Sequence, residues 1–196
     1  MTVSHATITG SENHEPKGVE SAGLGFIYVA NGSGSGTWRI LSYTDYPAGP
    51  HVIIEDQKTS GVDGQTVTAN TDTQLNLTTL VYNHATLAAL ASNQFVLPAG
   101  TYYFRFSAPT YNVANAKVWL RNVTDSTDAI IGTTNNDGAR GAYAITLQHS
   151  GSGILTIAAS KTFELRVRTD GTQPLSTGYN DGRIQVYSHI EITKLA

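Results

Sequence analysis

Histidines are the residues of this chain best suited by type to hold a metal ion or to move a proton. They are His5, His14, His51, His84, His149 and His189. No two of them stand two or four residues apart, the spacing that directs two imidazoles at one ion. We expect His14, beside Glu15, to be a turn or interface residue, and His149 and His189 to lie on strand faces. The spacing predicts no metal site.

Two polar loops offer the oxygen ligands that calcium prefers. They are Asp-Ser-Thr-Asp at 125–128 and Asn-Asn-Asp-Gly at 135–138. Neither contains the alternating acidic run that ends in a bidentate glutamate. Asp and Asn in such loops usually bond their own backbone, and Gly138 can adopt the positive φ of a tight turn. We expect plain turns here, and no cofactor.

The chain lacks the sequence patterns of common catalytic sites. Its 15 acidic residues form no obvious pair, and no Gly-x-Ser-x-Gly elbow is present. The glycine-rich stretch 32–36 lacks the lysine and the following helix of a phosphate loop. We therefore expect no enzymatic activity. An enzyme of glycan degradation is a rival hypothesis that an activity screen would separate.

Several aromatic residues stand on predicted polar faces or in loops: Tyr103, Tyr111, Trp119, Tyr179 and Tyr187. Aromatic rings in such places either fill subunit interfaces or stack on sugars. A trimer buries them without a ligand, whereas a lectin needs them grouped in a groove beside polar groups. We expect Tyr103, Trp119 and Tyr187 at a trimer interface, with sugar binding as the alternative.

Alternation of apolar and polar residues from about residue 73 onward predicts an all-β domain. The residues expected to face its core are Tyr102, Phe104, Phe106, Ala108, Phe163, Leu165, Val167, Ile184, Val186, Ile190 and Ile192. Further strands are expected near 76–82, 93–97, 116–123, 128–132, 142–149 and 153–158, with turns at 135–138, 151–153 and 170–171. Segment 85–91 is a short helix or a strand edge. So many strands without crossover helices favour a two-sheet jelly-roll β-sandwich.

The chain before this domain has a different composition. Residues 1–40 are expected to form an extended anchoring arm, with short strands at 24–30 and 37–41 around the Gly/Ser spacer 32–36. Residues 41–72 contain turn signals around a brief strand at 52–54 and are expected to be a connector. The main domain then occupies 73–196.

Composition excludes several classes of partner. Charged residues make up 14% of the 196 residues, and the net charge is −3 with no cluster of Lys or Arg. This balance favours neither nucleic acid nor an anionic membrane as a partner. The absence of cysteine excludes disulfides and thiolate sites. No segment resembles a signal peptide or a transmembrane helix, so we expect synthesis in a cytosol.

The arm resembles the amino-terminal segment of head-decoration and head-fibre proteins of tailed bacteriophages. The similar features are a His-x-Pro-Lys-Gly run at 14–18, Val-Ala-Asn-Gly at 29–32 and a closing tryptophan. The resemblance implies a virion protein on the outer surface of the phage head, made in the bacterial host cytoplasm and bound to the major capsid protein. The implied anchor residues are His14, Glu15, Pro16, Lys17, Gly18, Val19, Tyr28 and Trp38.

A second resemblance concerns the main domain. Residues 95–104 (Phe-Val-Leu-Pro-Ala-Gly-Thr-Tyr-Tyr-Phe) and the long final strand look like the tumour-necrosis-factor and complement-type jelly roll. That resemblance implies a compact homotrimer with aromatic residues along its axis. Together the two resemblances favour a capsid decoration or head-fibre protein. The alternative is a receptor-binding tail protein or carbohydrate-binding module that recognises a host-surface glycan.

Overall fold

The structure, a computed structural model, describes residues 26–30, 36–40, 51–136 and 145–195. The chain divides into two units, Met1–Pro47 and Ala48–Ala196. In the first unit, β1 (Phe26–Ala30) and β2 (Gly36–Ile40) form an antiparallel hairpin in which Tyr28 is opposite Trp38. Both short strands expected in the arm are thus confirmed. The anchor residues His14 to Val19 lie outside the described residues.

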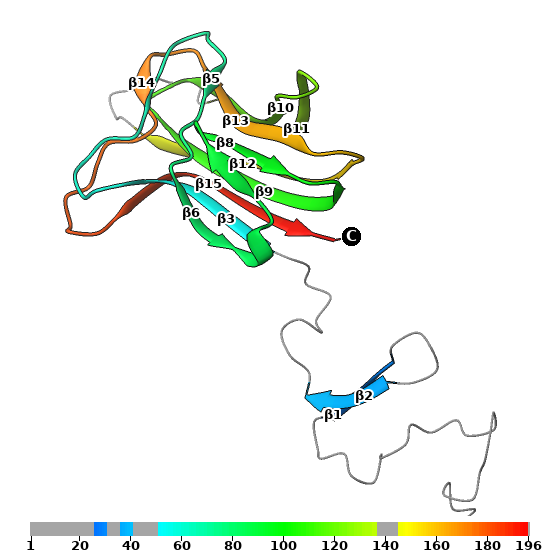
Figure 1. The fold of residues 1–196 in the computed structure, drawn as a ribbon. Coiled ribbons are helices and arrows are strands. Elements are labelled where there is room, and N and C mark those ends of the chain that lie inside the picture. Colours follow the sequence, from blue (N-terminus) through cyan, green and yellow to red (C-terminus); the bar gives the residue numbers. More distant parts are fainter. Residues whose placement is uncertain (1–25, 31–35, 41–50, 137–144, 196) are drawn as a thin grey trace, which may run out of the picture. The chain divides into compact units, whose positions relative to one another are not determined.

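The second unit consists of two facing sheets (Figure 1). One sheet has the order β12-β9-β15-β3-β6: β12 (Thr146–Ile157), β9 (Gly100–Tyr111), β15 (Gln185–Lys194), β3 (His51–Lys58) and β6 (Thr79–Asn83). The other has the order β11-β10-β13-β8-β7: β11 (Thr127–Asn136), β10 (Asn115–Asn122), β13 (Lys161–Thr169), β8 (Gln94–Leu97) and β7 (Ala89–Ala91), with β5 (Thr73–Gln74) also on β13. β4 (Thr66–Val67) and β14 (Gln173–Pro174) form a small ribbon.

The pairing of the long strands defines a jelly roll. β3 pairs with β15, β8 with β13, β9 with β12, and β10 with β11, all antiparallel. Among these eight strands, the first in the chain pairs with the last, the second with the last but one, and so on inward. This nested order is that of a long hairpin wound around a core. The expected all-β jelly-roll sandwich is confirmed.

The core follows the alternation of the sequence. On β9, Tyr102, Phe104 and Phe106 are buried, while Tyr103 and Arg105 on the opposite face are exposed. The Phe104 and Phe163 rings, from opposite sheets, lie with centroids 5.7 Å apart. Burying each such ring stabilises the fold by roughly 1.5–3 kcal/mol.

The last strand departs from the expected alternation. Ile190 and Ile192 face the core as expected, but Ile184 and Val186 are 66% and 46% exposed. A bulge between Val186 and His189 changes the phase of β15, so Tyr187 and its successor are both buried. A bulge inserts one residue and reverses which face the following side chains take.

The expected turn at 151–153 does not exist. β12 runs unbroken through these residues and joins the two strands expected at 142–149 and 153–158. A Cβ atom on Gly151 would lie 2.3 Å from Cζ of Phe106. The glycine is required by packing against a core ring, not by backbone reversal.

The sandwich begins earlier in the chain than expected. Residues 51–58, assigned to a connector, form β3 in the middle of a sheet, and Val52 and Ile54 are fully buried. Segment 85–91 divides between a 3-10 turn, His84–Thr86, and the edge strand β7, so the strand-edge alternative holds for its second half. Short apolar runs in this region belong to the core of the jelly roll.

Candidate functional site

A groove of about 370 Å³ lies where the outer face of β9 and β12 meets β11. Its lining consists of one aromatic ring, one guanidinium, one aliphatic side chain and small polar residues: Tyr103, Arg105, Ile131, Gly132, Thr133, Ser150, Gly151 and Ser152. The volume is in the range of pockets that hold a side chain or a small ligand.

Two glycines create the floor of this groove. A Cβ atom on Gly132 would lie 2.5 Å from the carbonyl oxygen of Val118 and 2.8 Å from that of Ser150. β11 and β12 are also joined by the Ser150 amide, which donates to Thr133 Oγ1 at 3.1 Å. Because the backbones of β10 and β12 lie so close to Gly132, a residue with a side chain does not fit at this position, and the groove stays open.

Exposed apolar side chains surround the groove. Tyr103 is 39% exposed, Ile131 51% and Ile154 65%. Ile154 is directly opposite Tyr103 in the β9–β12 pair. We call these three residues the apolar rim. Adjacent exposed apolar groups on a sheet face are typical of a surface that another molecule covers.

A row of charged groups continues across the same face. His189 Nδ1 lies 3.0 Å from Glu55 Oε1, and its Nε2 lies 3.1 Å from Glu191 Oε1. Arg105 is 69% exposed, and its guanidinium is 4.0 Å from Glu191. Both imidazole nitrogens are engaged with carboxylates, so this row joins β3 and β15 to each other and borders the groove.

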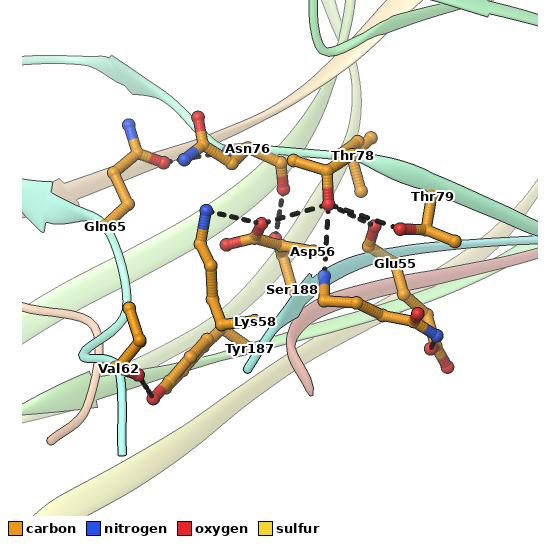
Figure 2. A network of polar contacts seen from close by, with 12 residues as sticks. Glu55, Asp56, Lys58, Val62, Gln65, Asn76, Thr78, Thr79, Tyr187 and Ser188 are labelled. Carbon is orange, nitrogen blue, oxygen red and sulfur yellow. Dashed lines mark hydrogen bonds and ion pairs between the residues drawn. The ribbon is translucent and has the colours of Figure 1, made fainter. Parts of the chain in front are cut away.

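A second polar cluster lies at the inner side of β3 (Figure 2). The Asp56 carboxylate is fully buried, with Lys58 Nζ at 3.2 Å and the Thr78 hydroxyl donating at 3.3 Å. The Ser188 hydroxyl donates to the Asn76 carbonyl, and Thr78 Oγ1 also accepts from the Gln57 amide at 3.1 Å. These groups hold the irregular chain after β5 against β3 and β15, while Asp56 Oδ2 is buried without a hydrogen-bond partner.

Two of the three expected interface residues are not on an exposed surface. Trp119 and Tyr187 are each 5% exposed. Trp119 lies between Ile131 and Arg166, its register partners on β11 and β13. Tyr187 turns inward at the bulge, and its hydroxyl donates to the Val62 carbonyl at 2.6 Å. Their expected exposed placement is wrong, while Tyr103 is exposed as expected.

The burial of Tyr187 also affects its ionisation. Desolvation raises the pKa of this phenol, and the negative charges of Asp63 and Asp56 raise it further. The neutral hydroxyl therefore persists as a donor to the loop that contains Val62. Tyr187 supports the fold of one protomer.

The acidic loop at 125–128 is closed by ion pairs. Asp125 lies 2.6 Å from Lys161 Nζ, and Asp128 lies 2.9 Å from the Arg121 guanidinium. Among the described residues, no group of three His, Asp or Glu is placed to hold a metal ion. In the same ranges, no helix is long and apolar enough to cross a membrane.

Sequence reasoning missed most of the groove. Ile131 and Ile154 were inside expected strands, but neither was assigned to an outer face. Their neighbourhood depends on the approach of β11 to β12, which no local pattern encodes. One signal was present: a Gly-Ser-Gly run inside a strand often marks a close approach of backbone.

No protein-family model and no curated protein matches this sequence. The crystal structure of murine APRIL at pH 5.0 is similar with a TM-score of 0.47 and 8% identity, over 74% of this chain and 98% of that chain. The globular domain of zebrafish complement 1qA protein has a TM-score of 0.46 and 12% identity, over 76% of this chain and 98% of that chain. At values this low the likeness says nothing about partners or activity, and the fold class rests on the strand order.

Proposed function

We propose that this chain is a non-enzymatic structural subunit of a virion. In this proposal the jelly roll forms a homotrimer, and the arm binds the major capsid protein on the outer surface of a phage head. The observation that supports assembly most directly is the apolar rim around the groove. The phage assignment is supported by the sequence of the arm.

The rim and the groove suit contact between copies of the chain. Tyr103, Ile131 and Ile154 supply apolar area, and the groove beside them supplies a hollow for a protruding side chain of a neighbour. Interfaces are strongest where an aromatic anchor and a pocket meet at their centre. A cyclic assembly closes when such a surface contacts a different surface of the next copy. The number three comes from the resemblance of residues 95–104 to trimeric modules.

Assembly also supports attachment. An arm with few apolar residues gains little from a single contact, but three arms on one trimer act at a high effective concentration. Met1–Pro47 and Ala48–Ala196 are two compact units of the chain, which suits this division of labour. Durable attachment then follows from three modest contacts.

The test of assembly compares two isoleucines of equal exposure. Ile154 is 65% exposed beside the groove, and Ile184 is 66% exposed at one end of the sandwich. Ile154→Asp should convert the homotrimer to monomer in light scattering, because a carboxylate cannot be buried there without a partner. Ile184→Asp should leave the trimer intact. A monomeric wild-type chain, or a trimeric Ile154→Asp variant, would contradict the proposed interface.

The test of attachment concerns the arm. Trp38→Ala should weaken binding to undecorated phage heads by about 2–4 kcal/mol per contact, the usual effect of removing an aromatic anchor. The melting temperature of the free trimer should hardly change. A lower melting temperature with unaltered occupancy would instead make Trp38 a residue of the fold and move the anchor to His14–Val19.

A further inference from the structure

Two loops meet at one end of the sandwich. They are residues 59–65, after β3, and residues 176–184, before β15, and we call them the distal tip (Figure 1). Lys58 is opposite Gln185 in the β3–β15 pair, and His51 is opposite Thr193. The tip therefore lies at the end of these two strands opposite His51.

Hydrogen bonds lock the two loops together. The Gly61 amide donates to the Tyr179 carbonyl at 3.2 Å, and the Gly182 amide donates to the Ser60 hydroxyl at 2.8 Å. The Gly178 amide donates to the Asp63 carboxylate at 2.7 Å. The tip is therefore a preorganised surface, and a ligand would bind it without paying for loop ordering.

The tip presents an aromatic ring with polar groups around it. Tyr179 is 74% exposed, the largest exposure among the large apolar residues of the described chain. Asn180, Asp181 and Arg183 follow it and are also exposed. The Arg183 side chain is 86% exposed, and its guanidinium lies 3.6 Å from the Asp181 carboxylate. An exposed ring beside fixed donors and acceptors is the usual form of a recognition surface.

We propose that the distal tip binds a neutral carbohydrate, with Tyr179 as the platform for one sugar ring. A pyranose has an apolar face of C–H groups and a rim of hydroxyls. The Tyr179 ring matches the face, and the amide, carboxylate and guanidinium groups that follow it match the rim. Asp63 and Asp181 outnumber Arg183 on these loops, so the charge favours neutral over acidic sugars.

The size and composition of the tip favour a sugar over a protein. A stable protein interface buries about 800 Å² on each partner and has an apolar centre. On the tip, charged and amide residues separate Tyr179 from Ile184, and the two loops are rich in Gly, Ser and Thr. Such a surface suits a small amphipathic ligand. The accessibility of the tip on an assembled particle rests on the proposed function, in which the arm and not the sandwich binds the capsid.

The experiment uses the full chain and two tyrosines. The probe is a printed array of neutral oligosaccharides of hexoses and N-acetylhexosamines, followed by calorimetric titration with the oligosaccharide that binds best. Tyr179→Ala should lower the affinity tenfold or more, while Tyr179→Phe should retain most of it because the ring remains. The control is Tyr82→Ala, a 42% exposed tyrosine on β6 opposite Ile53, toward the other end of the sandwich.

The possible results separate this proposal from the structural role. Loss of binding in Tyr179→Ala with retention in Tyr82→Ala supports the sugar platform. Binding that Tyr179→Ala leaves unchanged, or a wild-type chain that retains no neutral oligosaccharide, overturns it. Light scattering and head attachment are measured on the same variants. A normal trimer that decorates heads but binds no sugar would refute the platform and leave the proposed function intact.

Discussion

The two outer faces of the sandwich differ in how their polar groups are satisfied. On the six-stranded sheet, the buried carboxylate of Glu164 is paired within the protomer: Arg166 Nε lies 2.5 Å from Glu164 Oε1, and Gln94 Nε2 donates to Glu164 Oε2 at 2.8 Å. The Glu164 side chain is only 3% exposed. The ring of Trp119, between these strands, is covered as well. We call this the complete face, because its buried carboxylate has its partners within one copy of the chain, although the Trp119 indole Nε1 is buried without a hydrogen-bond partner.

The outer face of the five-stranded sheet is different. It has a groove whose floor is backbone and hydroxyl groups, and Ile154 beside it is 65% exposed. Its Arg105 guanidinium is 4.0 Å from the Glu191 carboxylate and mostly in solvent. We call this the open face. Mutations on the complete face should change the stability of the protomer, whereas mutations on the open face should change assembly.

The largest expected effect is at the seam that joins the two faces. Gly151→Ala places a Cβ within 2.3–2.9 Å of the Phe106 ring and the Gly132 Cα atom. Overpacking typically costs about 1–3 kcal/mol and occasionally more, and we expect the upper end of this range here because both a core ring and backbone must move. Denaturant unfolding measures it, with Gly153→Ala as the control. There the three atoms nearest to the new Cβ belong to the Ile130 side chain, at 3.2 Å or more. A loss of stability equal to that of Gly151→Ala would contradict the packing role assigned to Gly151.

The next effect tests the complete face directly. Arg166→Leu leaves the buried Glu164 carboxylate without its cation, and the unfolding free energy should fall by about 2 kcal/mol. The loss of unfolding free energy is limited because Glu164 still accepts the hydrogen bond from the Gln94 amide and because Arg166 is partly exposed. Arg105→Leu on the open face is the matched variant and should change unfolding by less than about 0.5 kcal/mol. Equal losses in the two variants would remove the distinction between the faces.

A third prediction concerns acid and the core side of β12. His149 is fully buried, and its Nε2 lies 2.7 Å from Thr110 Oγ1. Burial lowers the pKa of His149 from its ordinary 6.5, and a hydrogen bond with the Thr133 backbone opposes this in part. The unfolded chain therefore binds this proton more readily than the folded chain. Stability is complete above pH 6.5 and falls below it, by at most about 1.4 kcal/mol per pH unit from this group.

The measurement for His149 is a comparison of pH profiles. Unfolding free energies of wild type and His149→Gln are determined from pH 7.5 to 5, and the difference between them isolates this histidine from the carboxylates. The wild type should lose more stability than the variant as pH falls. Parallel profiles would contradict the prediction, because they would show that protonation of His149 does not lower the free energy of unfolding.

The sequence predicted the class of fold because alternation on β9 and β13 is regular, and those strands hold the core. It did not predict β3 as a central strand, because a sheet position depends on pairing with β15, over a hundred residues away. The sequence did not predict that Tyr187 faces inward, because a bulge changes the phase of β15. It did not predict that Trp119 is buried, because its long neighbours lie on the adjacent strands β11 and β13. The groove required knowledge of which backbones approach each other. Tyr103 was correctly placed because its position depends only on local alternation.

The smallest expected effect is at an exposed ion pair. Arg168 and Asp72 form an ion pair of 2.9 Å on the complete face, but their side chains are 52% and 47% exposed. Solvent screens such pairs, and holding two long side chains in one geometry offsets most of the attraction, so a double-mutant cycle with Arg168→Ala and Asp72→Ala should give a coupling below about 0.5 kcal/mol. The coupling should fall further in high salt. A coupling free energy as large as the loss of unfolding free energy in Arg166→Leu would mean that ion pairing alone stabilises this face. A small coupling free energy means that an ion pair stabilises the fold only where burial removes the competing water, as at Glu164.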